Sequence, residues 1–213
     1  MKISLLILII FRFLLLVNVQ FVSADVNVLQ LVLEFQPFNW TVVKYAVFSG
    51  ISGATASVAM IVTMWFFRQY LGLPDTITGI IATVSVFLYY LGFGLAWLDW
   101  MVYVAATLGV FRNMVVPCIR SYLCGLVAHS ENGKLLSFMS VLTSFTPLAG
   151  SAIFNMLYAQ TNNWMPGLCM IVAAAMMVPV GLGLVYVQIV RKKVAYTVDE
   201  TDFILPTDFV TKV

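Results

Sequence analysis

Two arginines carry the most distinctive chemistry of this sequence. Arg112 lies inside a long apolar run, and Arg120 ends that run within Pro117-Cys118-Ile119-Arg120-Ser121, which we predict to be a short polar connector between two apolar helices. A guanidinium keeps its positive charge and binds carboxylates, phosphates and carbonyl oxygens through its N–H donors. We therefore expect Arg120 to attract an anionic solute, with Arg112 assisting. The alternative is that both side chains extend toward the aqueous interface without a binding role.

A stripe of polar residues in the apolar run 135–159 is the second candidate. Helical spacing places its members on one face, and a stripe facing lipid would be costly. The stripe should therefore face either a neighbouring helix or a water-filled cavity, and Pro147 can bend the helix at that point. Together with the residues around the two arginines, it gives the predicted solute path: Arg112, Asn113, Arg120, Ser121, Ser144, Pro147, Ser151, Asn155 and Tyr158.

The composition predicts the elements that must position these residues. The chain is 62% hydrophobic and 9% charged, whereas soluble domains carry about 25% charged residues. A transmembrane helix needs about 20 mostly apolar residues. Six stretches qualify, and they predict an all-α membrane protein of six transmembrane helices: 3–22, 45–67, 76–97, 101–119, 135–159 and 168–190.

We interpret residues 1–190 as one six-helix bundle and 191–213 as a tail. Residues 1–24 form either a retained first helix or a signal peptide, because Val22-Ser23-Ala24 is typical of a small-residue cleavage site.

The basic residues predict the orientation of the bundle, because cytoplasmic loops are enriched in lysine and arginine. A cytoplasmic start places most of them, Arg120 and Lys134 included, on the cytoplasmic side together with the C-terminus, while Lys44 lies outside. The sequon Asn39-Trp40-Thr41 then falls on the outer face as a possible glycosylation site.

Several other function classes are disfavoured. Three cysteines without a CxxC pair and a single histidine, His129, predict neither a disulfide framework nor a metal site. The net charge of +2 gives no reason to expect a nucleic-acid partner, and no cofactor is indicated. Gly50-Ile51-Ser52-Gly53 resembles the motif of rhomboid proteases, but His129 lies on the opposite predicted side from Ser52. We therefore do not expect an enzyme.

Four stretches resemble solute carrier family 46, within the major facilitator superfamily. Val116-Pro117-Cys118-Ile119-Arg120-Ser121-Tyr122-Leu123, then Glu131-Asn132-Gly133-Lys134-Leu135, is similar to the family's loop after helix ten. Phe35-Gln36-Pro37-Phe38-Asn39-Trp40 resembles the family's basic-Pro-Phe-Gly-Trp outer loop, which has glycine in place of Asn39. Leu157-Tyr158-Ala159-Gln160-Thr161 and Trp164-Met165-Pro166-Gly167 are similar to motifs at the end of helix eleven and before helix twelve.

The resemblance implies helices seven to twelve of a twelve-helix major-facilitator-type transporter, with alternating access between two halves. Arg120 matches an arginine of the family implicated in substrate binding and proton coupling. Gly133 and Lys134 match the gating loop before helix eleven. The first span lacks the histidine of the folate transporter, which weakens the case for folate and for proton coupling.

We therefore expect a transporter, or half of one, for a small anionic organic solute, with or without proton coupling. It would lie in the plasma or lysosomal membrane, and its partners would be the lipid bilayer and a second six-helix half or a second copy of the chain. The alternative is a non-transporting six-helix scaffold or a truncated regulatory partner of a transporter.

Overall fold

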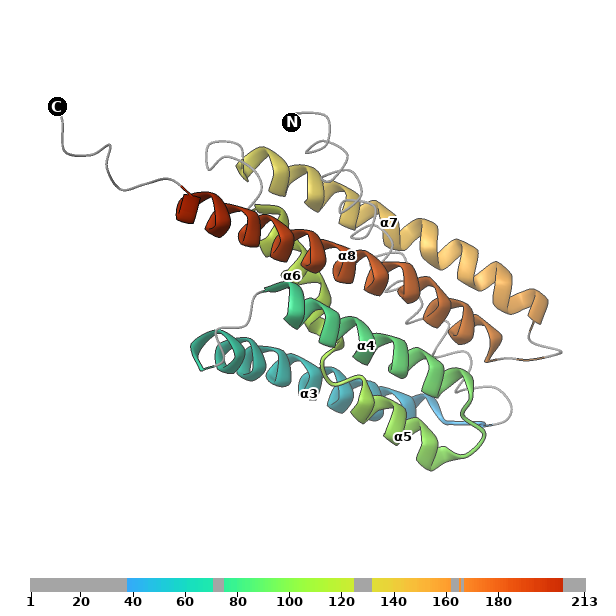
Figure 1. Cartoon of the computed structure of the whole chain (residues 1–213). Helices are drawn as coiled ribbons and strands as arrows, with labels where there is room; N and C mark the ends of the chain where they lie inside the picture. Colours follow the sequence, from blue (N-terminus) through green and yellow to red (C-terminus); the bar gives the residue numbers. More distant parts are fainter. Residues whose placement is uncertain (1–37, 71–74, 125–131, 162–164, 166, 205–213) are drawn as a thin grey trace, which may run out of the picture.

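The computed structural model describes residues 38–70, 75–124, 132–161, 165 and 167–204, and every regular element in those ranges is helical (Figure 1). The elements are α3 (Val42–Gln69), α4 (Asp75–Gly94), α5 (Asp99–Leu108), the short 3-10 helix η2 (Arg112–Met114), α6 (Val115–Cys124), α7 (Asn132–Thr161) and α8 (Leu168–Ile204).

Five helical stretches of the described chain are long and apolar enough to cross a membrane. They are Val42–Phe67, Ile77–Gly94, Asp99–Ser121, Gly133–Thr161 and Leu168–Ile189. Their positions agree with five of the six predicted spans. The predicted first span, 3–22, and His129 lie outside the described residues, so the six-helix half-transporter stays a prediction.

Helix α4 is the centre of the bundle. It packs against α5, α6 and α8, and α7 lies beside α8 on the side away from α3 and α5 (Figure 1). Glycines allow α4 to approach its neighbours closely. A Cβ at Gly92 would lie 2.8 Å from Ala105 Cβ, and a Cβ at Gly167 would lie 2.4 Å from Gly94 O. The backbones of α4 and α8 therefore meet where the two helices end and begin.

Helices α3 and α7 expose most of their apolar side chains. Only 11% of the α3 span and 18% of the α7 span are buried, against 56% for α4. Large side chains such as Trp65, Phe145 and Leu148 are more than half exposed. In a membrane these two helices therefore present their surface to lipid or to another bundle.

The predicted helix 101–119 is not continuous, and the predicted connector at Pro117–Ser121 is wrong. The helix of this span is interrupted between Leu108, where α5 ends, and Arg112, where η2 begins. Pro117–Ser121 belongs to α6. Glycine is required at position 109 within the break, since the Tyr89 ring fills the space in which a Cβ would lie. Pro117 is tolerated because it stands in the first turn of α6, where a missing N–H costs little.

Candidate functional site

Arg112 lies at the break between α5 and α6, against the aromatic ring of α4. Its guanidinium carbon is 4.8 Å from the centroid of the Tyr89 ring, and Nη1 donates to the Gly109 carbonyl at 3.5 Å. A cation over an aromatic face is stabilised by the ring quadrupole. The Tyr89 ring therefore packs against Gly109 and also lies against the guanidinium of Arg112.

Two backbone carbonyls at the break accept hydrogen bonds from side chains. Ser85 Oγ on α4 donates to the Leu108 carbonyl, and Arg112 takes the Gly109 carbonyl. Irregular backbone at membrane depth is tolerated only where such groups are satisfied by protein or water. Helix α4 therefore stabilises the interrupted span through the hydroxyl of Ser85 and the ring of Tyr89.

Asn113 connects η2 to the outlying helix α3. Its Nδ2 donates to Ser57 Oγ at 3.4 Å, and Ser57 Oγ in turn donates to the Gly53 carbonyl at 2.9 Å. The predicted solute-path residue Asn113 thus contributes to helix packing in this structure.

Arg120 lies on α6, half-buried, and extends to the neighbouring helix α7. Its Nη2 donates to Thr143 Oγ1 at 3.4 Å, which is a long hydrogen bond. Its Nε is buried and has no hydrogen-bond partner among the described residues. A guanidinium whose buried N–H lacks an acceptor is the environment in which an added carboxylate or carbonyl oxygen would bind favourably. Ser121, the next residue, is exposed.

The predicted polar stripe on α7 divides into two environments. Tyr158 is only 6% exposed and belongs to the hydrophobic core, together with Phe154. Ser144 and Asn155 are exposed, while Pro147 and Ser151 are half-buried. The helical step of about 100° per residue puts the stripe on the flank of the buried face of α7.

The serine hydroxyls of the stripe bond to their own helix. Ser144 Oγ donates to the Ser140 carbonyl at 2.9 Å, and Ser151 Oγ donates to the Leu148 carbonyl at 3.0 Å. The amide of Asn155 is exposed, and a bare amide facing lipid would be costly. This flank therefore suits water or a polar partner better than acyl chains.

Gly133 and Lys134 lie in the first turn of α7, which begins at Asn132, and both are exposed. The structure thus places them at a helix start and not within the preceding loop.

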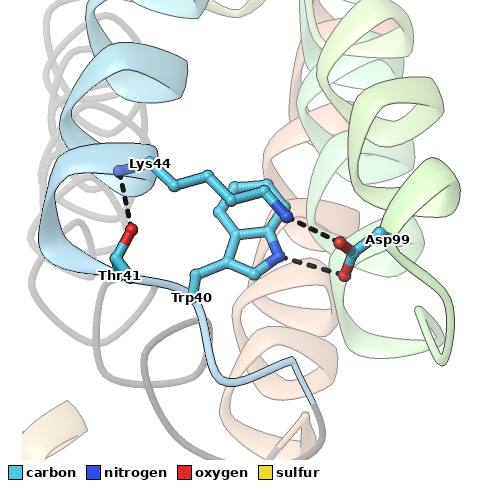
Figure 2. Close-up of polar contacts among 4 residues, drawn as sticks. All are labelled: Trp40, Thr41, Lys44 and Asp99. Atoms are coloured by element: carbon cyan, nitrogen blue, oxygen red, sulfur yellow. Dashed lines mark hydrogen bonds and ion pairs between the residues drawn. The ribbon is translucent and has the colours of Figure 1, made fainter.

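A polar cluster joins the beginning of α3 to the beginning of α5 (Figure 2). Lys44 Nζ is 2.6 Å from Asp99 Oδ2, and Trp40 Nε1 donates to Asp99 Oδ1 at 3.0 Å. The Lys44 ammonium also lies 4.2 Å from the centroid of the Trp40 ring. Thr41 begins α3 by accepting from the Lys44 backbone N–H at 3.3 Å.

The possible glycosylation site Asn39 precedes this cluster. Asn39 has a φ of 47° and is exposed. Glycine adopts this left-handed conformation freely and asparagine adopts it more readily than most other residues. Asn39 therefore has a backbone conformation that a glycine at this position would also adopt.

The sequence analysis did not single out Asp99 as a functional residue. One signal could have found it: Asp99 and Lys44 are opposite charges at the ends of apolar stretches on the same predicted side. Within the described part of the chain, no group of three or more histidine, cysteine or acidic residues could hold a metal ion.

Comparison with known proteins finds that the chain is similar to members of the SLC46 family. It is 26% identical over 151 residues to the probable peptidoglycan muropeptide transporter SLC46 of Drosophila melanogaster, covering 70% of this chain. It is 39% identical over 69 residues, 32% of this chain, to the proton-coupled folate transporter of Bos taurus. It is 30% identical over 74 residues, 34% of this chain, to the lysosomal proton-coupled steroid conjugate and bile acid symporter SLC46A3 of Gallus gallus.

The matched regions are only part of each relative. They span 28% of the Drosophila protein, 15% of the folate transporter and 16% of SLC46A3. No known family model matches the chain. The similarity and the five apolar helices together indicate a multi-pass membrane protein related to transporters.

Proposed function

We propose that this chain forms one bundle of a transporter that moves a small anionic organic solute across a membrane by alternating access. The observation that carries the proposal is Arg120, a half-buried cation whose Nε has no acceptor among the described residues. Such a charge within an apolar bundle is expensive unless an anion or water compensates it. Two relatives that match part of this chain are named as a transporter and a symporter.

The path for the solute runs beside α6 and α7. Arg120 supplies the charge, and the flank of α7 with Ser144, Ser151 and Asn155 supplies polar groups that lipid would not tolerate well. A second wall is needed, and the exposed faces of α3 and α7 offer surface for it. We propose that another six-helix half, or a second copy of the chain, supplies that wall.

Coupling to protons is a secondary proposal. It is supported by the names of two relatives, which are called proton-coupled. Asp99, an acid whose contacts the structure describes, is already paired with Lys44. The membrane is proposed to be lysosomal or plasma, with the C-terminus in the cytoplasm.

Uptake of radiolabelled organic anions in oocytes tests the proposal. The chain should raise uptake of at least one anion above that of water-injected cells. Arg120→Ala should abolish the increase at equal surface expression, and Arg120→Lys should retain part of it because the charge persists. Normal surface expression without uptake of any anion would reject the transporter.

A scaffold function is the competing candidate, and one observation favours it. Two of the predicted path residues, Arg112 and Asn113, are engaged in contacts within the protein. If the chain is a scaffold, Arg120→Ala should lower its expression or its assembly with a partner. The native chain should then show no solute uptake. The same oocyte experiment, scored for surface protein and uptake separately, distinguishes the two functions.

A further inference from the structure

The side chain of Arg120 reaches from α6 to a hydroxyl inside the neighbouring helix. Arg120 is the next-to-last residue of the apolar span Asp99–Ser121, and its Nη2 donates to Thr143 Oγ1 at 3.4 Å. Thr143 lies about 15 Å along α7 from the start of the span Gly133–Thr161. An arginine near the end of a span normally extends to the water interface. Arg120 extends to a residue within the bundle instead.

The hydroxyl of Thr143 is a fixed acceptor for this guanidinium. Thr143 Oγ1 donates its own hydrogen to the Ser140 carbonyl at 3.0 Å, within α7. A hydroxyl has one hydrogen and two lone pairs, so the bond to Ser140 sets the orientation in which a lone pair meets Arg120. Thr143 is half-buried, which partly shields this contact from water.

The contact with Thr143 leaves most of the binding capacity of the guanidinium unused. The bond is long, its acceptor is neutral, and the buried Nε has no partner among the described residues. A charged acceptor makes a hydrogen bond roughly twice as strong as a neutral one does. An anion can therefore displace or supplement Thr143, and it meets a donor that has already left the water.

We propose that Thr143 is a positioning residue, which holds the Arg120 guanidinium inside the bundle while no solute is bound. Without the hydroxyl the side chain turns to the interface, where water satisfies Nε, and an arriving anion has to draw it back. The effect on the solute rests on the proposed transport function. The effect on the position of Arg120 does not, so the two are measured separately.

Chemical modification of arginine measures the position of Arg120 without a solute. The purified full chain in detergent is treated with 4-hydroxyphenylglyoxal, which modifies accessible guanidinium groups, and the rate at Arg120 is followed by mass spectrometry of the peptide that contains it. Arg112 is the internal reference, because it contacts Tyr89 and Gly109 and not Thr143.

The variants separate the hydroxyl of Thr143 from its shape. Thr143→Val keeps the shape and removes the hydroxyl, Thr143→Ala removes it in a smaller side chain, and Thr143→Ser keeps it. Ser144→Ala is the matched control: Ser144 Oγ also donates to the Ser140 carbonyl, at 2.9 Å, but from an exposed position.

Loss of the hydroxyl should expose Arg120. In Thr143→Val and Thr143→Ala, Arg120 should be modified roughly three- to tenfold faster than in the native chain, the range expected when a hydrogen bond to a charged group is lost. Arg112 should keep its native rate, and Thr143→Ser and Ser144→Ala should behave like the native chain. The inference is overturned if Arg120 keeps its native rate in both variants that lack the hydroxyl, or if Arg112 is accelerated equally, which would indicate general loosening.

Uptake in oocytes then tests the effect on the solute. For an organic anion whose uptake depends on Arg120, Thr143→Val should raise the apparent KM roughly three- to tenfold and leave Vmax nearly unchanged, because the hydroxyl acts on binding. Thr143→Ser should restore the native KM. An unchanged KM in Thr143→Val at normal surface expression rejects the positioning role in transport. If no organic anion is taken up, the proposed function fails, and the modification rates still decide whether Thr143 holds Arg120.

Discussion

The Lys44 ammonium and the Asp99 carboxylate lie 2.6 Å apart and join the beginning of α3 to the beginning of α5. Trp40 completes the cluster: its indole N–H bonds to the same carboxylate, and its ring packs edge-on against Phe48 at a centroid distance of 5.4 Å. This end of the described bundle is thus held by one ion pair over an aromatic cluster.

The Trp40 ring should matter more than the ion pair. The side chains of Lys44 and Asp99 are 41% and 52% exposed, and exposed pairs contribute about 0–1 kcal/mol. Trp40 is 4% exposed, and truncating a buried aromatic side chain costs about 3–5 kcal/mol in soluble proteins. In thermal unfolding of the purified chain in detergent, Trp40→Ala should lower the midpoint several times more than Lys44→Met. Equal effects would show that the ring contacts are not what holds this end.

Asn39 should accept glycine but not a β-branched residue. Its φ of 47° lies in the left-handed region, which glycine enters without strain and valine does not. Asn39→Gly should leave the unfolding midpoint almost unchanged, and Asn39→Val should destabilise the chain by about 1–2 kcal/mol. Both variants remove the sequon, so a shared effect on mobility in gels would report the loss of a glycan and not the backbone.

Gly109 should be intolerant of even a methyl group. A Cβ there would lie 2.2 Å from Cδ2 of Tyr89, and relieving that overlap requires the ring or the break to move. Gly109→Ala should destabilise the chain by about 1–3 kcal/mol, as overpacking of a filled site usually does. Gly50→Ala is the matched control, because nothing lies within 4 Å of a Cβ at that helical position. If Gly109→Ala is as stable as Gly50→Ala, the close packing of the Tyr89 ring on Gly109 is contradicted.

The flank of α7 should be accessible to water in the membrane. Cysteines placed at Ser144 and Asn155 should react with a membrane-impermeant thiol reagent, added to inside-out or right-side-out vesicles. Cysteines at Phe145 and Met156, apolar positions that are 66% and 67% exposed in the isolated chain, should be protected by lipid or by a partner. The free cysteines Cys118 and Cys169 are buried, and the partly exposed Cys124 is replaced by serine in every variant to keep the background low. Protection at all four positions would favour a dry helix interface and hence the scaffold.

The sequence predicted the apolar spans well because span length and composition follow from the bilayer thickness. Five predicted stretches fall within a few residues of the helices found. The need for glycine at position 109 escaped prediction because it depends on a ring from another helix: nothing in the local residues says that Tyr89 fills the position of a Cβ. Pro117 suggested a connector, although proline is well tolerated in the first turn of a helix.

The candidate site was predictable in its residue types but not in its pairings. Arg112 and Arg120 both stand out as charges among apolar residues, yet only the fold shows that Arg112 lies on Tyr89 while the Nε of Arg120 has no acceptor in the described chain.

The most direct test of the central claim is the uptake of labelled organic anions by oocytes expressing the native chain, Arg120→Lys or Arg120→Ala at equal surface density. The transport account predicts saturable uptake by the native chain, a reduced but measurable rate for Arg120→Lys, and the rate of water-injected cells for Arg120→Ala. Uptake by Arg120→Ala equal to that of the native chain would contradict it.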